Sequence, residues 1–429
     1  MHIGLYCPAE TGHLNTMLPL GEALQARGHR VTFVGIEDAR DKVEAARLDF
    51  FAIATNVLPE GSMDEILETL GELKGLPALL YTVKAFRDTS EKVLKHGAIA
   101  CKDLQLDGMV IDQATAEASA IARFLDVPYV TVCSALPFDP EPGVPPLFST
   151  WTYKDAWLPK LRNALIHGFF SSTLGAIVKA PIRAFFKAQN LALPENLNSP
   201  VAMISHQPKS FEFPREKLPV HFHFTGPYHT TTSRKPVDFS WERLTGEPLI
   251  YASMGTLQNR LSDVFQTIAT ACENLSAQLV ISLGGSGDPA DLPPLPGNPI
   301  VVRYAPQIEL LKKATLTITH AGMNTTLESL THGVPMVAIP VTNDQPGIAA
   351  RIKWTGAGEF VPLDRLDAET LRKLVSQVLE TPSYRDRAQS FAEEIATSGG
   401  TKLAVSIIET ALADKQPVVS VQANASERS

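Results

Sequence analysis

Residues 316–345 read LTITHAGMNTTLESLTHGVPMVAIPVTNDQ, and this stretch decides the fold. An apolar run over residues 316–319 is followed by a turn containing Gly322 and then by a helical pattern in which Glu328 stands three residues after Thr325. This order predicts a strand, a tight turn and a helix. The unpaired N–H groups and the positive end of such a helix favour binding of an anionic phosphate. The same pair, Thr325 and Glu328, is also typical of a capping box that needs no ligand, so both interpretations stay open.

Short apolar runs alternate with helical patterns in two similar halves of the chain. This alternation predicts an α/β fold of two doubly wound sheets, whose parallel strands carry helices on both faces. A polar stretch with two prolines separates the halves and predicts a linker. We expect an N-terminal domain over residues 1–228, a linker over 229–248, a C-terminal domain over 249–414 and a flexible tail over 415–429. Such sheets bind ligands beyond the carboxyl ends of their strands, so two facing sheets would form a cleft.

The composition is that of an ordinary globular protein. The 429 residues are 44 % hydrophobic and 20 % charged, which suits two or three domains. The net charge of −8 argues against nucleic acid as a partner, because proteins that bind the phosphate backbone usually present a basic face. The cysteines form no C-x-x-C pair, so we expect reduced thiols in the cytoplasm. With no secretory leader and no apolar run of about 18 residues, we expect no spanning helix.

His13 and Asp112 are candidates for proton transfer. His13 begins a predicted helix after the first strand, and Asp112 ends another predicted strand of the same sheet. Helix-start polarity should keep the His13 ring neutral, as a proton acceptor must be. In the alternative interpretation, His13 is held by local hydrogen bonds and Asp112 caps the next helix.

Several catalytic motifs are absent from the sequence. It contains no G-x-S-x-G elbow, no G-x-x-x-x-G-K-[ST] loop and no H-E-x-x-H pair. It also lacks a D-x-D carboxylate pair of the kind that can hold a divalent metal. These absences disfavour hydrolase, P-loop and zinc-dependent chemistry, and we expect no metal site.

The pattern in and around residues 316–345 resembles the nucleotide-sugar signature of the family 1 glycosyltransferases, the UDP-glycosyltransferases. Within that family, residues 250–258, 344–347 and 399–401 are most similar to the zeaxanthin glucosyltransferases. The family resemblance rests on Gly12, His13, Asp112, residues 253–256 and 304–307, His320, Gly322, Asn324, Thr325, Glu328, residues 333–335, Pro340, Asp344 and Gln345.

The resemblance implies a GT-B fold and an inverting transfer of glucose from UDP-glucose, a co-substrate, to an acceptor hydroxyl. It implies that His13 is the general base and that Asp112 orients it. Glu328 would bind the ribose, Tyr304 would stack on uracil, and Asp344 with Gln345 would hold the sugar. The remaining donor-binding candidates, most of them around the diphosphate, are Gly255, Thr256, Gln307, His320, Gly322, Asn324 and Thr325.

The acceptor is expected to be an apolar small molecule. A carotenoid such as zeaxanthin is the first candidate, and a flavonoid, terpenoid or macrolide is the second. A nucleotide-sugar 2-epimerase and a non-catalytic binding protein share the expected architecture and stay as alternatives. Phe138, Phe148 and Trp151 are the candidate acceptor-binding residues.

A basic and aromatic segment follows these residues. Residues 151–187 carry six basic residues and one acidic residue, together with two tryptophans and four phenylalanines. Such a segment could rest on an anionic membrane as a peripheral contact. Alternatively, its helices cover the acceptor pocket and expose only the ends of their lysines.

Overall fold

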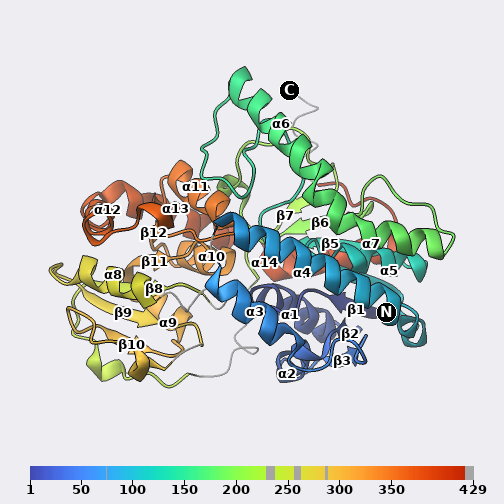
Figure 1. The fold of residues 1–429 in the computed structure, drawn as a ribbon, viewed down its shortest axis with the longest axis horizontal. Coiled ribbons are helices and arrows are strands. Elements are labelled where there is room, and N and C mark those ends of the chain that lie inside the picture. The colour runs from blue at the N-terminus through green and yellow to red at the C-terminus, as the bar shows by residue number, and fades with distance from the viewer. Residues whose placement is uncertain (74, 229–236, 256–261, 286–287, 421–429) are drawn as a thin grey trace.

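Two parallel sheets form the protein, one in each half of the chain (Figure 1). The computed structural model describes residues 1–73, 75–228, 237–255, 262–285 and 288–420. The N-terminal sheet has the strand order β3-β2-β1-β4-β5-β6-β7, and the C-terminal sheet has the order β10-β9-β8-β11-β12-β13. All paired strands run parallel, which confirms the predicted α/β fold.

The N-terminal half contains β1 (His2–Tyr6), α1 (Thr11–Ala26), β2 (Arg30–Gly35), α2 (Arg40–Ala45), β3 (Asp49–Ala52), α3 (Ser62–Glu72), α4 (Gly75–His96), β4 (Gly108–Asp112), α5 (Ala116–Phe124), β5 (Tyr129–Cys133), α6 (Trp157–Ser172), α7 (Leu174–Ala188), β6 (Met203–Ser205) and β7 (Phe222–Phe224). The C-terminal half contains β8 (Leu249–Ser253), α8 (Ser262–Cys272), β9 (Gln278–Ser282), β10 (Ile300–Val302), α9 (Gln307–Leu311), β11 (Ala314–Thr319), α10 (Met323–Thr331), β12 (Met336–Ala338), α11 (Gln345–Thr355), β13 (Gly358–Phe360), α12 (Ala368–Glu380), α13 (Pro382–Thr397) and α14 (Gly400–Asp414).

The central strands are buried along their whole length. Every residue of β4, β5 and β8 is buried, as expected for parallel strands that helices cover on both faces. Their sequences, GMVID, YVTVC and LIYAS, are therefore continuous apolar runs with few polar interruptions. The strands place their carboxyl ends at one edge of each sheet, where the polar candidate residues follow them.

The last helix returns to the N-terminal domain. Buried residues of α14, such as Ile408 and Leu412, share a core cluster with Ile3 and Leu5 of β1. The packing thus places α14 with the N-terminal sheet, whereas the sequence-based division kept all of residues 249–414 together. The difference arises because an apolar helical face does not specify which domain covers it.

The segment after α14 is also attached to the N-terminal domain. Val418 N donates to Val201 O at 2.8 Å, and Ser420 N donates to Val220 O at 2.9 Å. The predicted flexible tail therefore begins with backbone hydrogen bonds, and residues 421–429 lie outside the described part. Residues 229–236 of the predicted linker lie outside it as well.

A buried ion pair joins the two domains. Glu212 Oε1 accepts hydrogen bonds from Arg351 Nε at 3.1 Å and from Nη2, and the side chains are 2 % and 1 % exposed. Gln207 Nε2 donates to the other Glu212 oxygen at 2.8 Å. Burial would raise the pKa of Glu212, but the charges of Arg351 and Arg215 outweigh it and hold that pKa below its usual value of 4.5. The carboxylate thus stays ionised inside the protein.

We predict that Arg351→Met lowers the free energy of unfolding by about 3–5 kcal/mol, because it leaves Glu212 buried without its main partner. Chemical denaturation followed by fluorescence measures the change. Lys353→Met is the matched control, since it removes the exposed partner of Glu359 and should cost about 0–1 kcal/mol. Equal losses in the two variants would contradict a special role for the buried pair.

The same pair predicts a dependence on pH. Because the folded-state pKa of Glu212 is depressed, its contribution is full above the unfolded value of 4.5 and is lost as the pH falls through the folded value.

Candidate active site

Three strands of the N-terminal sheet place His13, Asp112 and Ser134 at one edge. His13 lies in the first turn of α1 after β1, Asp112 ends β4, and Ser134 follows β5. His13 Nδ1 lies 2.8 Å from Asp112 Oδ2, although the residues are 99 positions apart. Ser134 Oγ donates to the same Asp112 oxygen and lies 2.8 Å from His13 Nδ1. Asp112 Oδ1 also accepts from Ala114 N at 2.9 Å, so the carboxylate both fixes the imidazole and supports the turn before α5.

Glu10 lies on the other side of the His13 ring. Its Oε2 is 3.6 Å from His13 Nε2, and its side chain is 14 % exposed. Glu10 precedes α1 in an extended conformation and makes no side-chain capping bond. Sequence reasoning missed both Glu10 and Ser134. The three-residue spacing from Glu10 to His13 and the position of Ser134 at a strand end were the available signals.

The carboxylates around His13 control its protonation. Burial disfavours the imidazolium, but the charges of Asp112 and Glu10 and the Asp112 hydrogen bond outweigh burial and raise the pKa of His13 to about 9. The expectation that helix-start polarity keeps this ring neutral is therefore wrong, because the nearby carboxylates act more strongly. Burial also raises the pKa of Glu10 and of Asp344, which approaches His13 from the C-terminal domain. Such a histidine is a strong base once its proton has left.

His320 lies opposite, at the end of β11. Its ring packs against two glycines, since a Cβ on Gly255 would lie 2.4 Å from Cε1 and a Cβ on Gly322 would lie 2.4 Å from Nε2. Gly255 also has a φ of +74°, which side chains rarely adopt. Burial lowers the pKa of His320 to about 4, against the raising effect of a backbone hydrogen bond with Ser253. His320 is therefore neutral at pH 7, and it stands two residues before Gly322, the N-cap of α10.

A chain of hydrogen bonds holds Glu328 in place. Tyr251 OH donates to Gln307 Oε1 at 2.9 Å, and Gln307 Nε2 donates to Glu328 Oε2 at 2.6 Å. Gln307 Nε2 also lies 3.4 Å from Thr325 Oγ1. The N-cap of α10 is Gly322, without a side-chain capping bond, so the capping-box interpretation of Thr325 and Glu328 is wrong.

Tyr304 offers an exposed ring beside these residues. It is 46 % exposed and lies against Gly285, where a Cβ would come within 2.4 Å of the ring. Gly285 has a φ of +100°, so this close approach requires glycine. The ring can therefore present a face to a planar ligand.

Asn324 connects the two halves of the site. Its Nδ2 donates to Gly12 O at 2.8 Å, and Thr16 Oγ1 donates to its Oδ1 at 3.3 Å. The starts of α1 and α10 therefore face each other, with His13 beside this contact. An anion between the domains would meet the positive ends of both helices.

The two remaining sugar-binding candidates also lie at this edge. Asp344 is the residue before α11, and Gln345 Oε1 accepts from Val341 N at 2.8 Å and from Thr342 N at 3.1 Å. Gln345 therefore shapes the loop that carries Asp344. Thr256, which was expected with Gly255 near the diphosphate, lies outside the described residues.

A narrow apolar cavity adjoins Glu10. Its volume of about 50 Å³ is well below the roughly 300–1,000 Å³ of typical ligand pockets, so a small molecule could enter only if the cavity widened. None of Phe138, Phe148 and Trp151 lines it, and sequence reasoning missed its helical wall. Phe148 instead packs on Phe170 of α6, with ring centroids 4.2 Å apart. The apolar wall comes mainly from α3 and α4 and includes Met63, Ile66, Leu70, Tyr81, Ala85 and Phe86.

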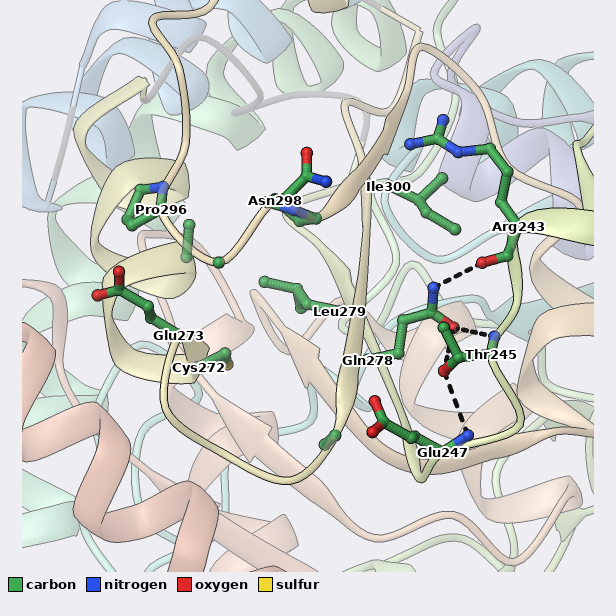
Figure 2. A pocket seen from close by; sticks show the side chains of 14 residues that line it. Arg243, Thr245, Glu247, Cys272, Glu273, Gln278, Leu279, Pro296, Asn298 and Ile300 are labelled. Carbon is green, nitrogen blue, oxygen red and sulfur yellow. Dashed lines mark hydrogen bonds between the residues drawn. The ribbon is translucent and has the colours of Figure 1, made fainter.

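A second cavity, of about 390 Å³, lies away from these residues (Figure 2). It is lined by Gln278 and Ile300, which begin β9 and β10, so it lies at the amino ends of the C-terminal strands. Gln278 bonds the backbone of Arg243 and Thr245 there. The candidate site lies at the opposite edge of this sheet.

The geometry predicts that His13 titrates near pH 9 in the free protein, as measured by NMR of ring-labelled histidine. Asp112→Asn and Glu10→Gln should each lower this pKa, because each removes a negative charge beside the imidazolium. Asp41→Asn, which removes an exposed carboxylate of the same domain, should leave it unchanged. A His13 pKa at or below 6.5 would show that burial dominates instead. The contribution of His13 to stability should be full below pH 6.5 and be lost as the pH rises through about 9.

Comparisons with known proteins agree with this architecture. The family model described as UDP-glucoronosyl and UDP-glucosyl transferase matches residues 4–393. The chain is 29 % identical to a zeaxanthin glucosyltransferase from Pantoea ananas, over 98 % of each protein, and 27 % identical to one from Pseudescherichia vulneris, over 97 % of this chain and 99 % of the relative. The crystal structure of the glycotransferase of kitacinnamycin superposes with a TM-score of 0.71 at 22 % identity and covers 97 % of this chain and 98 % of that one. The chain therefore belongs to the UDP-glucoronosyl and UDP-glucosyl transferase family, and it is a glycosyltransferase with the GT-B fold.

Proposed function

We propose that the enzyme transfers glucose from UDP-glucose to a hydroxyl group of an apolar acceptor, with a carotenoid such as zeaxanthin as the first candidate. The observation that carries this proposal is the position of the His13–Asp112 pair beside Asn324 and the start of α10. A base on one domain thus meets an anion-binding helix end on the other. The similarity to zeaxanthin glucosyltransferases supports the choice of donor and acceptor.

The C-terminal side of the site would bind the nucleotide. As the glycosidic bond breaks, negative charge develops on UDP, and donors aimed at the diphosphate stabilise that charge. The start of α10, neutral His320, Thr325 and the Gly255 turn would supply those donors, and we propose that no metal is needed. Asn324 would exchange its contact with Gly12 for the diphosphate.

The rest of the donor would bind around this point. Glu328, held by Gln307, would accept hydrogen bonds from the ribose hydroxyls. Tyr304 would stack on the uracil, and Asp344 with Gln345 would hold the glucose hydroxyls.

The N-terminal side would activate the acceptor. In its deprotonated form, which is the minor form below pH 9, His13 would take the proton of the acceptor hydroxyl at Nε2. The hydroxyl oxygen would attack the anomeric carbon, and UDP would leave with the bonding electrons. Asp112 would stabilise the imidazolium that forms. A single displacement inverts the anomeric carbon, so an α-linked donor yields a β-glucoside.

The cavity beside Glu10 supports an apolar acceptor, because its wall consists largely of apolar side chains of α3 and α4. A flavonoid, terpenoid or macrolide fits the same chemistry and is the alternative acceptor class. An epimerase would isomerise a UDP-sugar without any acceptor. The described cysteines, Cys7, Cys101, Cys133 and Cys272, are all free and buried, which supports a reducing cytoplasm as the place of this reaction.

We predict that His13→Ala lowers the turnover rate by about 10²- to 10⁴-fold, because general-base catalysis is lost, while the affinity for UDP changes little. Turnover is measured with saturating donor and acceptor, and affinity by calorimetry. His332→Ala changes a histidine at the far end of α10 and should retain activity. Near-normal turnover of the His13 variant would falsify the proposed role.

We also predict that Glu328→Ala weakens UDP-glucose binding by about 1–3 kcal/mol, because a charged hydrogen-bond acceptor for the ribose is lost. A binding titration measures the loss. Glu309→Ala removes an exposed carboxylate of neighbouring α9 and should bind the donor normally. A lower melting temperature of the Glu328 variant with unchanged donor affinity would instead assign Glu328 a structural role only.

A further inference from the structure

The apolar face of α6 points toward solvent. Trp157, Leu158, Leu161, Leu165 and Phe169 are 72, 59, 49, 66 and 62 % exposed. Their spacing places them on one side of the helix, and no charged residue interrupts that side. In Figure 1, α6 projects from the body of the protein at the top. A surface helix normally turns such a stripe toward the core, so the orientation of α6 needs an explanation.

The opposite side of α6 fixes this orientation. Asn163 is buried and its Nδ2 donates to Pro142 O at 3.0 Å. His167 Nε2 donates to Val144 O at 2.9 Å. Phe170 packs on Phe148 from the same side. The polar contacts therefore hold the helix with its apolar side outward.

The surrounding charge favours an anionic surface. Residues 156–194 contain no aspartate or glutamate, in a chain that has 46 such residues. In α7, which follows α6 after Thr173, Lys179, Arg183 and Lys187 are exposed. Negatively charged lipid headgroups attract such a cluster, and the attraction adds to the burial of apolar side chains.

The five basic residues of α6 and α7 differ in their surroundings. Lys179, Arg183 and Lys187 of α7 are exposed to solvent, whereas the two basic residues of α6 contact other side chains. Lys160 pairs with Asp155 at 2.8 Å, and the Arg162 guanidinium lies 3.7 Å from the centre of the Trp151 ring. Thus α6 offers the apolar side chains for such a surface, and α7 offers the positive charges. The sequence alone did not show that these two roles fall on different helices.

The packing of α7 argues against a span through a membrane. By length and composition the stretch Trp157–Ala188 could span a bilayer, which the sequence analysis did not anticipate. However, Ile182, Phe185 and Phe186 of α7 are buried in a core cluster with residues of α4 and α5. Spanning would remove these side chains from the domain core.

We propose that the outward face of α6 inserts into the surface of an anionic lipid bilayer, with the basic residues of α7 over the headgroups. This inference deepens the proposed function and rests on it for the acceptor. The helix α7 packs against α4, and α4 contributes Tyr81 and Phe86 to the apolar cavity. The cavity therefore lies one helix layer from the lipid in which an apolar acceptor dissolves. A second copy of the chain fits less well, because a two-fold contact through α6 would bring two acid-free basic segments together.

Sedimentation with vesicles tests the proposal without donor or acceptor. Vesicles of phosphatidylcholine and phosphatidylglycerol should carry the protein into the pellet at low salt, with weaker binding at high salt. Leu161→Gln with Leu165→Gln should reduce binding about tenfold or more, because two apolar side chains no longer leave water. Lys179→Gln, Arg183→Gln and Lys187→Gln together should reduce binding by about tenfold or more and remove most of its salt dependence.

Leu193→Gln with Val220→Gln is the matched control, because both residues are exposed outside α6 and should leave binding unchanged. All variants should keep their melting temperature and their activity on a water-soluble phenol, which separates this proposal from the proposed function. A protein that stays in the supernatant at low salt, or an α6 variant that binds normally, overturns the proposal. Membrane-bound protein that resists alkaline extraction would also overturn it, because such resistance indicates a membrane span. A dimer that depends on α6 and forms without any vesicle binding would overturn it as well.

Discussion

The hydrogen bond between His13 and Asp112 depends on one constraint, the common direction of the strands that precede them. Parallel strands place all their carboxyl ends at one edge, so residues 99 positions apart become neighbours. The same constraint gathers the donor-binding candidates at the edge of the second sheet. The two edges then meet through Asn324 and Gly12, and the buried pair of Glu212 and Arg351 also joins the domains. Thus the fold positions the site through strand direction and interdomain contacts.

The charges at this meeting point set the chemistry. His13 lies among carboxylates and has a pKa raised to about 9, whereas buried His320 has a pKa lowered to about 4. One histidine is therefore suited to take and hold a proton, and the other to remain neutral beside an anion. This division matches a reaction in which a proton moves on one domain while negative charge develops on the other. In the proposed function, the apolar cavity would receive the acceptor, and in the further proposal the outward face of α6 would contact the lipid that supplies it.

Much of the fold and part of the site could be predicted from the sequence, because buried parallel strands are continuous apolar runs and the polar residues at their ends are readable. The expected pairing of His13 with Asp112 rested on the shared sheet edge together with the family resemblance, because sequence alone could not show a contact across 99 positions. Local patterns could not show that α14 packs on the first sheet or that the apolar stripe of α6 faces solvent. The periodicity of apolar residues shows which residues share a helix face, but it does not show which element packs against that face. Likewise, the effect of Glu10 on His13 depends on a distance between side chains, and the cavity wall depends on how α3 and α4 pack.

The most direct test of the central claim is an analysis of the products formed from UDP-glucose and zeaxanthin supplied in anionic vesicles. Mass spectrometry and NMR should find a β-glucoside of the carotenoid, formed together with an equal amount of UDP, and no turnover when acceptor is absent. An isomerised UDP-sugar without acceptor, or an α-glucoside, would contradict the account.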